Sequence, residues 1–410
     1  MPQQEESFIA HARALIGENW CFLPDTIPVS SLPPAFHEVE CACKNISIDY
    51  SMTGVGVRLS LDQKFTRVDL DLLHRIPTLA TPNKRCLMNM LSILAHCYRW
   101  DRSPPDDDSA ALTTLDLPPG LDALWRTCAA QTGQPVVGTN ANLKYWNWHL
   151  VGRQPASRYH PEDLLRRKVS VNHLWLCGKP NEALENWILT FVLAEAGGAS
   201  VIKNLIQAIQ YAIDEQPAPC QQAMQDLHVS ILQFNQLFGR LLKGSRVDAG
   251  IWLKQVQHTF AWGIEDAQSG QTLQGPSGMQ VGVIQTLNLG LAIPDHSEIA
   301  RMSEKTRQYY SPDQRKFFDE LIAHAPVLAE YAGRNIALSK IYNECVNELA
   351  RWRVSHQKRG AWYLKSAGAE TNRKRISTGL TLPADVDGTE KFIELMQQRI
   401  DETRSAKKQV

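Results

Sequence analysis

The apolar positions of this chain repeat with a helical period over most of its length. The helices predicted in this way cover residues 86–100, 182–213, 219–243, 247–264, 278–291, 311–330, 333–365 and 389–404. The alternation of apolar and polar residues that indicates half-buried strands is scarce throughout. The pattern therefore predicts an all-α protein whose long helices pack into a bundle.

Proline and polar residues interrupt this pattern in a way that predicts two domains. Residues 1–60 contain several proline turns, which favours a wrapping segment with short helices. A second interruption, at 152–162, contains Gly152, Pro155 and Ser157 and is the best candidate for a domain boundary. We therefore predict a small, mostly helical N-terminal domain over residues 1–160 and a large all-α domain over residues 161–410.

Charge and composition exclude several classes of protein. Lys plus Arg and Asp plus Glu each number 43 among the 410 residues, so the chain has no net charge with which to attract nucleic acid. The most apolar run, 187–202, is interrupted by Glu195 and is shorter than the roughly 20 residues that span a bilayer, so it predicts a buried helix. An acidic amino terminus and nine cysteines without a repeating framework favour a cytoplasmic location with reduced thiols. Tryptophan is unusually frequent, with 11 residues against 8 methionines.

The predicted helix 333–365 carries a histidine on its apolar stripe. The stripe consists of Leu338, Tyr342, Cys345, Leu349, Trp352 and His356, at alternating steps of four and three residues. The opposite, polar face carries Lys340, Asn347, Glu348, Arg351, Lys358 and Arg359. The imidazole of His356 is therefore expected to point inward. Periodicity leaves two interpretations open, a hydrogen-bonded core histidine or the axial ligand of a haem iron held on a bundle helix.

The sequence that ends in this histidine resembles the proximal-ligand helix of the indoleamine 2,3-dioxygenase family. The matching segment is Glu344-Cys345-Val346-Asn347-Glu348-Leu349-Ala350-Arg351-Trp352-Arg353-Val354-Ser355-His356. Further matching segments are Leu23-Pro24, Leu32-Pro33, 97–101, 142–148, 198–203, 275–278 and 309–318. Because all of them follow in family order over nearly the full chain, the resemblance favours the ligand role for His356.

The resemblance implies two all-α domains, with haem b in the larger one. It implies that His356 is the proximal iron ligand and that Arg353, three residues earlier, faces the haem propionates. Ser277 and Gly278 correspond to the loop over the haem. The reaction implied is insertion of O2 across the C2–C3 bond of an indole in tryptophan metabolism. Because indole is electron-rich at C3, a largely apolar distal pocket without an essential general base suffices for it.

Several positions that contact the substrate in this family differ here. With residues 198–203 as the anchor, Trp187 stands where the family usually has a distal Phe, and Phe191 stands where it often has a small Ser. With Trp262 as the anchor, Ile251 stands at the second distal Phe and Val256 at the Arg that binds the substrate carboxylate. These four residues, together with the hydroxyl of Ser277, are the candidate catalytic residues.

The loss of the cation at Val256 weakens the case for free L-tryptophan, because a buried carboxylate without a cationic partner is costly. A shift of one turn in this alignment would bring Lys254 or Gln255 toward the pocket. Gly138 stands where the family often has a Tyr. The equivalent of the glycine-rich carboxy-terminal loop is either Ser377-Thr378-Gly379 or Asp387-Gly388-Thr389.

The sequence therefore predicts a haem-dependent dioxygenase that acts on tryptophan or, in view of Val256, on a tryptophan-derived indole. One alternative is haem-dependent mono-oxygenation or ring rearrangement of an aromatic substrate in natural-product biosynthesis. Another is a non-catalytic haem-binding sensor whose distal face is crowded by Trp187 and Phe191. The expected partners are a small indole or aromatic substrate and O2. Nucleic acid and membrane partners are not expected, and the chain is expected to be a monomer or a weak oligomer.

Overall fold

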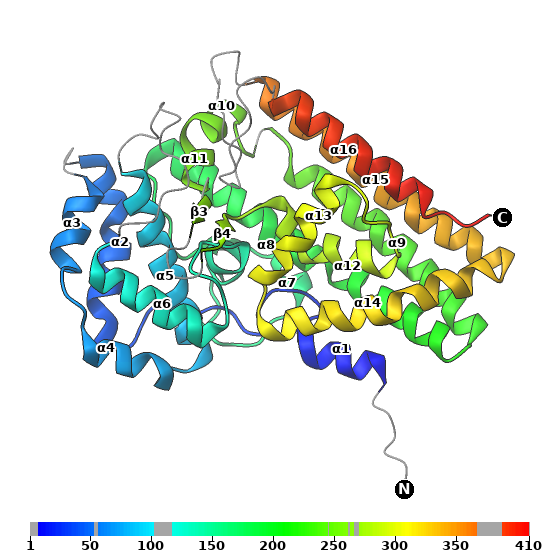
Figure 1. The fold of residues 1–410 in the computed structure, drawn as a ribbon, viewed down its shortest axis with the longest axis horizontal. Helices are drawn as coiled ribbons and strands as arrows, with labels where there is room; N and C mark the ends of the chain where they lie inside the picture. Colours follow the sequence, from blue (N-terminus) through cyan, green and yellow to red (C-terminus); the bar gives the residue numbers. More distant parts are fainter. Residues whose placement is uncertain are drawn as a thin grey trace, which may run out of the picture.

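The computed structural model describes residues 7–52, 56–101, 117–244, 246–260, 263–265, 270–366 and 388–409. Helices dominate this part of the chain, and each strand in it spans three residues (Figure 1). The predicted all-α fold class is confirmed.

Five helices of the N-terminal half gather at one end of the molecule (Figure 1). They are α2 (His37–Met52), α3 (Val57–Lys64), α4 (Leu70–Arg75), α5 (Thr81–Trp100) and α6 (Pro119–Thr132). The predicted helix 86–100 lies within α5, which begins at Thr81 with a proline in its first turn. α5 is central because it contacts α2, α3 and α6 and because Leu87, Leu91 and Leu94 on it are fully buried.

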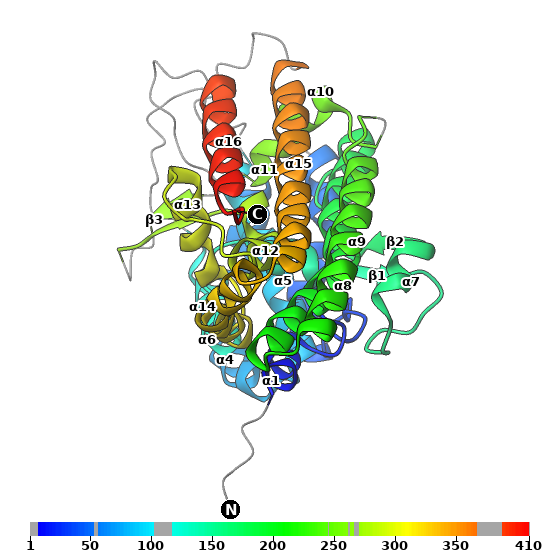
Figure 2. The same cartoon turned by 90° about the vertical axis from the view of Figure 1, so that its right-hand side faces the viewer.

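Six helices form the bundle in the other half of the molecule, and α12 is the shortest of them. They are α8 (Gly178–Ile213), α9 (Pro217–Leu241), α12 (Gly282–Gly290), α14 (Pro312–Gly333), α15 (Ile336–Ser366) and α16 (Gly388–Ser405). α9 packs against both α8 and α15, and α16 packs along α15 (Figure 2). Close approach of α15 and α16 depends on Gly360, because a Cβ there would lie 2.5 Å from the ring of Phe392.

The sequence sets the ends of these helices locally. α14 begins with a capping box in which Ser311 accepts from the backbone N–H of Gln314, and the Gln314 side chain accepts from that of Ser311. α15 begins after Asn335, whose side-chain oxygen accepts from the N–H of Ala337 at 2.8 Å. α14 and α15 are thereby separated at a defined residue although they are nearly continuous in sequence.

α8 is the central helix of the bundle. By length and composition it could cross a membrane, but 72% of its most apolar 18-residue window is buried inside the protein. It contacts α9, α12, α14 and α7 (Pro161–Arg166). The apolar run 187–202 is therefore part of the core, as predicted.

The predicted helix 247–264 is wrong at its carboxy-terminal end. This region contains α10 (Ala249–Ile251), the π-helical turn η4 (Trp252–Val256) and α11 (Gln257–Phe260). It then becomes the strand β3 (Gly263–Glu265), which pairs antiparallel with β4 (Thr272–Gln274). Gly263 has poor helix propensity and Ile264 favours an extended backbone, which explains the change.

One residue of the predicted polar face of α15 is also misplaced. Glu348 is 4% exposed, and its carboxylate accepts from the amide of Asn235 and pairs with Arg351. The stripe on the other side is confirmed, because Leu338, Tyr342, Cys345, Leu349 and Trp352 are all buried.

The remaining elements are short. They are α1 (Phe8–Ile16), η1 (Pro34–Phe36), η2 (Ile76–Thr78), the π-helical turn η3 (Ala141–Tyr145), β1 (Trp148–Leu150), β2 (Val169–Val171), η5 (Gly278–Gln280), α13 (Glu298–Lys305) and η6 (Thr306–Tyr309). α1 packs against α14 and α8, away from α2 to α6 (Figure 1). Phe22, which follows it, stacks on Phe318 with 5.3 Å between ring centroids. The described N-terminal segment thus wraps the bundle, and β1 pairs with β2 on either side of residue 160. The domain boundary at that residue stays a prediction.

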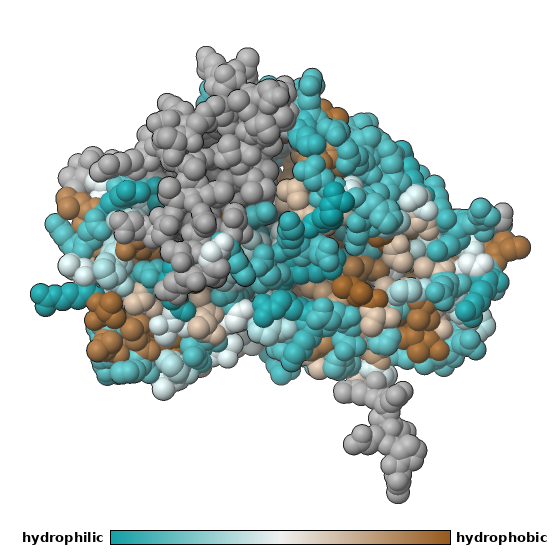
Figure 3. Space-filling view, viewed as in Figure 1, coloured by the Kyte–Doolittle hydropathy of each residue, from teal (hydrophilic) through white to brown (hydrophobic). Residues whose placement is uncertain are grey.

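The face of the molecule seen in Figure 3 is mostly hydrophilic. Apolar residues occur there in small, separated groups among the residues that the structure describes. Large exposed apolar side chains are scattered over several helices, for example Leu59 on α3, Leu70 on α4 and Ile322 on α14. Single exposed apolar residues of this kind are ordinary on globular proteins.

Candidate functional site

His356 lies on α15 within a cluster of aromatic rings. Trp352, one turn earlier, stacks on its imidazole with 5.2 Å between ring centroids and 7° between ring planes. Phe238 of α9 and Phe392 of α16 contact the imidazole with centroid distances of 6.1 and 6.0 Å. The predicted inward face of this helix is therefore the face that meets α9 and α16.

The imidazole of His356 has the properties of a ligand that lacks its partner. Its Nδ1 is buried and has no hydrogen-bond partner among the described residues. Burial, together with the nearby guanidinium of Arg353, lowers the pKa of His356 to about 4, so the ring is neutral at pH 7. Neutral imidazole is the form that binds a metal.

Arg353 is a buried cation without a carboxylate partner among the residues that the structure describes. It is 4% exposed, and its guanidinium donates a hydrogen bond to the side-chain oxygen of Asn288 on α12. Its Nε has no partner within the described part of the chain. Burial, reinforced by the charge of Arg399, holds its pKa well below the usual range. Asp295 and Glu402, the acids that oppose this effect, already pair with Arg399.

The residues of this region therefore fit haem. A haem carries an iron that takes a neutral imidazole and propionates that take a buried guanidinium. The two orphaned polar groups of His356 and Arg353 would both be satisfied by that one group.

Four aromatic residues, Trp187, Phe191, Trp252 and Phe260, form what we call the aromatic wall. Trp187 and Phe191 lie one turn apart on α8 with 5.2 Å between ring centroids, and Trp187 contacts Trp252 of η4 at 4.7 Å. Trp252 in turn contacts Tyr363 of α15 at 6.1 Å. The predicted distal residues Trp187 and Phe191 are thus brought together, and a chain of rings joins them to the helix of His356.

The other two predicted distal residues lie on the segment of Trp252. Ile251 is half-buried and ends α10, whereas Val256 is fully buried within η4. Lys254 and Gln255, the alternatives to Val256 after a one-turn shift, are both exposed. Neither of them supplies a buried cation. The alignment anchor Trp262 lies outside the described residues.

Ser277 and Gly278 lie at the start of η5. The Oγ of Ser277 accepts from the backbone N–H of Met279 at 3.2 Å, so this hydroxyl caps the short helix. Its carbonyl accepts from the side chain of Asn140 at 2.8 Å, which fastens the loop to the N-terminal end of η3. A Cβ at Gly278 would meet no atom within 4 Å, so open space adjoins the loop there. The predicted cofactor contacts of both residues stay predictions.

The space beside Gly138 is filled by a histidine. A Cβ at Gly138 would lie 2.1 Å from Nε2 of His96, which is buried on α5. The other ring nitrogen of His96 hydrogen-bonds the carbonyl of Thr259 at 2.9 Å. The glycine that replaces the family's usual Tyr is therefore required by His96.

Two buried ionisable residues near the wall, Lys144 and Glu195, were not predicted as site residues. Lys144 on η3 lies with its Nζ 3.2 Å from the ring centroid of Phe191. The next residue, Tyr145, donates a hydrogen bond at 2.8 Å to Glu195 on α8. Both Lys144 and Glu195 are 1% exposed or less. Their burial results from tertiary packing, and only the interruption of the apolar run by Glu195 hinted at it.

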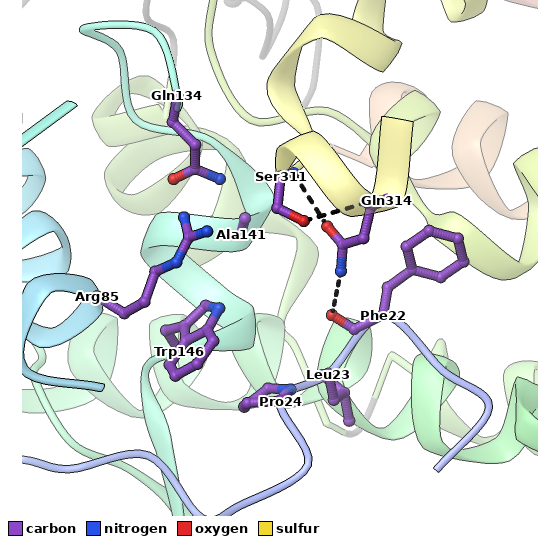
Figure 4. Close-up of a pocket in the computed structure, with 9 residues that line it drawn as sticks. All are labelled: Phe22, Leu23, Pro24, Arg85, Gln134, Ala141, Trp146, Ser311 and Gln314. Atoms are coloured by element: carbon purple, nitrogen blue, oxygen red, sulfur yellow. Dashed lines mark hydrogen bonds between the residues drawn. The ribbon is translucent and has the colours of Figure 1, made fainter. Parts of the chain in front are cut away.

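A separate cavity of about 60 Å³ lies between α5, η3 and the start of α14 (Figure 4). Arg85 and Trp146 face it from one side, and Gln314, which donates to the carbonyl of Phe22, faces it from the other. At about 30 Å³ per water molecule it has room for about two, far below the roughly 300 Å³ of a small-molecule pocket. This cavity is unsuited to an indole, and none of its lining residues is a predicted site residue.

The predicted carboxy-terminal loop is mostly outside the described residues. Ser377, Thr378, Gly379 and Asp387 all lie there. Gly388 and Thr389 are the first two residues of α16, whose Phe392 contacts His356.

Comparison with known proteins agrees with this arrangement. A family model described as indoleamine 2,3-dioxygenase matches residues 12–409. The chain is 27% identical over 297 residues to indoleamine 2,3-dioxygenase 2 of Homo sapiens, covering 68% of each chain. It is 24% identical over 311 residues to indoleamine 2,3-dioxygenase 1 of Rattus norvegicus, covering 69% of this chain and 71% of the relative. With a match over nearly its whole length, the chain belongs to the indoleamine 2,3-dioxygenase family.

Proposed function

We propose that this chain is a haem-dependent dioxygenase that inserts O2 across the C2–C3 bond of tryptophan or, in view of Val256, of a tryptophan-derived indole. Its family consists of haem-dependent oxidoreductases of tryptophan metabolism, so haem b is its cofactor. The observation that carries the proposal is the pair formed by His356 and Arg353. A neutral imidazole with a buried Nδ1 and a buried guanidinium lie one turn apart, and both Nδ1 of His356 and Nε of Arg353 lack a hydrogen-bond partner among the described residues.

Bound haem supplies the activation of O2 for this reaction. The residues of the chain have separate tasks around it. His356 presents a neutral ring nitrogen to the iron, and Arg353 neutralises a propionate. The aromatic wall offers flat apolar surfaces against which an indole can stack and from which water is excluded.

Val256 supports the choice of a derivative over free L-tryptophan. The residue is fully buried and apolar, and the nearby Lys254 is exposed. A tryptophan carboxylate placed at this point of η4 would lose its hydration without gaining a cation, which is costly.

Haem binding can be tested without turnover. Wild-type apoprotein titrated with hemin should develop a Soret band that His356→Ala changes or loses. His173→Ala is the matched control, because burial lowers the pKa of His173 to about 4 as well and the residue lies outside the proposed site. An unchanged Soret band in the His356 variant contradicts the ligand assignment.

Turnover separates the three functional interpretations. The haem-loaded protein is reduced without oxygen and then given O2 and a panel of indoles, and the products are analysed by mass spectrometry. A gain of two oxygen atoms supports dioxygenation, and a gain of one supports mono-oxygenation. Absence of product from every indole, with haem bound, favours the sensor.

A further inference from the structure

Lys144 is buried among aromatic rings. It lies within the π-helical turn η3 and is 1% exposed. Its Nζ is 3.2 Å from the ring centroid of Phe191, 5.3 Å from that of Phe260 and 5.6 Å from that of Trp187. Three of the four residues of the aromatic wall therefore surround one amino group.

Among the described residues, the contacts of this amino group are with aromatic rings, and it forms no salt bridge or hydrogen bond there. Burial alone holds the pKa of Lys144 well below its usual range. The faces of aromatic rings attract a cation, but they offset only part of the lost hydration. An anion bound beside the amino group would stabilise its charged form in this buried place.

The segment that carries Lys144 is held firmly. Tyr145 donates to Glu195 on α8 at 2.8 Å and to the carbonyl of Gln280 at 3.0 Å. The backbone N–H of Asn140 donates to the side chain of Gln280 at 2.9 Å. These buried bonds fix η3 against α8 and the loop of Ser277, so the amino group is presented at a defined point of the wall.

Two departures from the family pattern bear on this amino group. Phe191, where the family often has a small Ser, provides the ring on which the amino group lies. Val256, where the family has a cation, is apolar and fully buried, and Lys254 beside it is exposed. Among the described residues of η3 and η4, the buried lysine is therefore Lys144 of η3, whereas Lys254 of η4 is exposed.

We propose that Lys144 anchors an acidic indole by binding its carboxylate, so that the enzyme selects indole alkanoates over indole amines. The proposal rests on the proposed function, because it assumes that the indole stacks on the aromatic wall. Indole-3-propionate matches this arrangement, since its carboxylate is joined to the ring by a short chain and it has no ammonium group to be buried next to Lys144. Tryptamine, which carries only a cation, would be repelled by the lysine.

Binding to the haem-loaded protein by equilibrium dialysis tests this without any need for turnover. The wild type should bind indole-3-propionate at least about 10-fold more tightly than tryptamine or unsubstituted indole. Lys144→Met should weaken indole-3-propionate by about 10- to 100-fold and change indole by less than about 3-fold, whereas Lys144→Arg should retain the preference. Lys254→Met removes an exposed lysine of η4 and serves as the control, with no change expected.

Equal weakening of all three ligands in Lys144→Met would show a purely structural role and overturn the proposal. The wild-type preference is itself decisive if that variant does not fold, since equal binding of indole-3-propionate and tryptamine also overturns it. Failure of the Lys144 proposal can be distinguished from failure of the proposed dioxygenase function. A wild type that prefers the acid but oxidises no indole supports the Lys144 anchor and contradicts the dioxygenase. A wild type that oxidises indoles without preferring the acid supports the dioxygenase and contradicts the Lys144 anchor.

Discussion

Glu195 should make the stability of this protein fall as the pH rises toward neutrality. The carboxylic acid is fully buried in the middle of α8. Its Oε1 accepts hydrogen bonds from the hydroxyl of Tyr145 at 2.8 Å and from the backbone N–H of Gly282 at 2.5 Å. Burial raises its pKa to about 7 despite these bonds, which favour the ionised form.

The size of this stability change follows from the difference between the pKa of Glu195 in the folded protein and its pKa in the unfolded chain. In the unfolded chain Glu195 loses its proton near its ordinary pKa of 4.5, whereas in the folded protein it keeps the proton up to about pH 7. Its contribution is therefore fully present below pH 4.5, declines between these values and is lost above about pH 7. At about 1.4 kcal/mol per pH unit, the loss between pH 4.5 and about pH 7 amounts to about 3.5 kcal/mol.

Glu195→Gln removes this titration while keeping a side-chain oxygen for Tyr145 and Gly282. The free energy of unfolding is measured from urea curves followed by circular dichroism, at several values between pH 5 and pH 8. Equal m values of variant and wild type are required for the comparison. The variant should gain about 2.5 kcal/mol on the wild type between pH 5 and pH 8, because all other titrating groups are common to both.

Glu330→Gln, on the exposed face of α14, is the matched control and should leave the pH profile of stability unchanged. A stability difference between Glu195→Gln and wild type that is the same at every pH would refute the reasoning. It would mean that Glu195 ionises in the folded protein near its ordinary pKa.

Three further predictions concern other buried groups. Arg353→Met should stabilise the haem-free protein by about 1–3 kcal/mol in urea unfolding, because it removes a buried charge that lacks a carboxylate partner among the described residues. The same variant should transfer its haem to apomyoglobin faster than the wild type does. Slower haem loss would contradict the propionate role of Arg353. Gly138→Ala should destabilise the protein by about 1–3 kcal/mol, because the added methyl group would collide with His96. Gly239→Ala, in open space on α9, is the control and should stabilise the protein by about 0.5–1 kcal/mol. Equal urea midpoints for the two variants would argue against the crowding at His96. Arg399→Met should cost about 1–3 kcal/mol, because it removes the cation that pairs with Asp295 and with Glu402 of α16, and it should increase proteolysis of that helix. Unchanged protease resistance would mean that α16 is held by its apolar contacts alone.

The helices could be predicted because each buries a continuous apolar stripe. α8, α9, α14 and α15 agree with the pattern to within a few residues at each end. The failure at 247–264 has a local cause, since η4 is π-helical and a strand follows it. A period of 3.6 residues cannot describe a π-helical turn, and the pairing of β3 with β4 depends on a segment that is distant in sequence.

The proximal side of the site could also be predicted, and the distal side only in part. His356 lies on a periodic stripe, and the resemblance identified Arg353 three residues before it. Lys144 follows no such pattern, because its burial depends on Phe191 and Phe260 from two other helices. A lysine in a short irregular segment is exposed in most proteins, so sequence alone favours the wrong environment here.

The departures from the family pattern are paired in space. Gly138 leaves the room that His96 fills, and Phe191 provides the ring on which Lys144 lies. Such pairs are coupled, because each member is costly without the other: a larger residue at 138 collides with the imidazole, and a small residue at 191 leaves the amino group with fewer rings around it. Restoring a single family residue, for instance an arginine at 256, would therefore add a second buried cation to a wall that already holds Lys144. The effects of such substitutions on ligand binding should be non-additive, and the distal wall has to be altered as a unit.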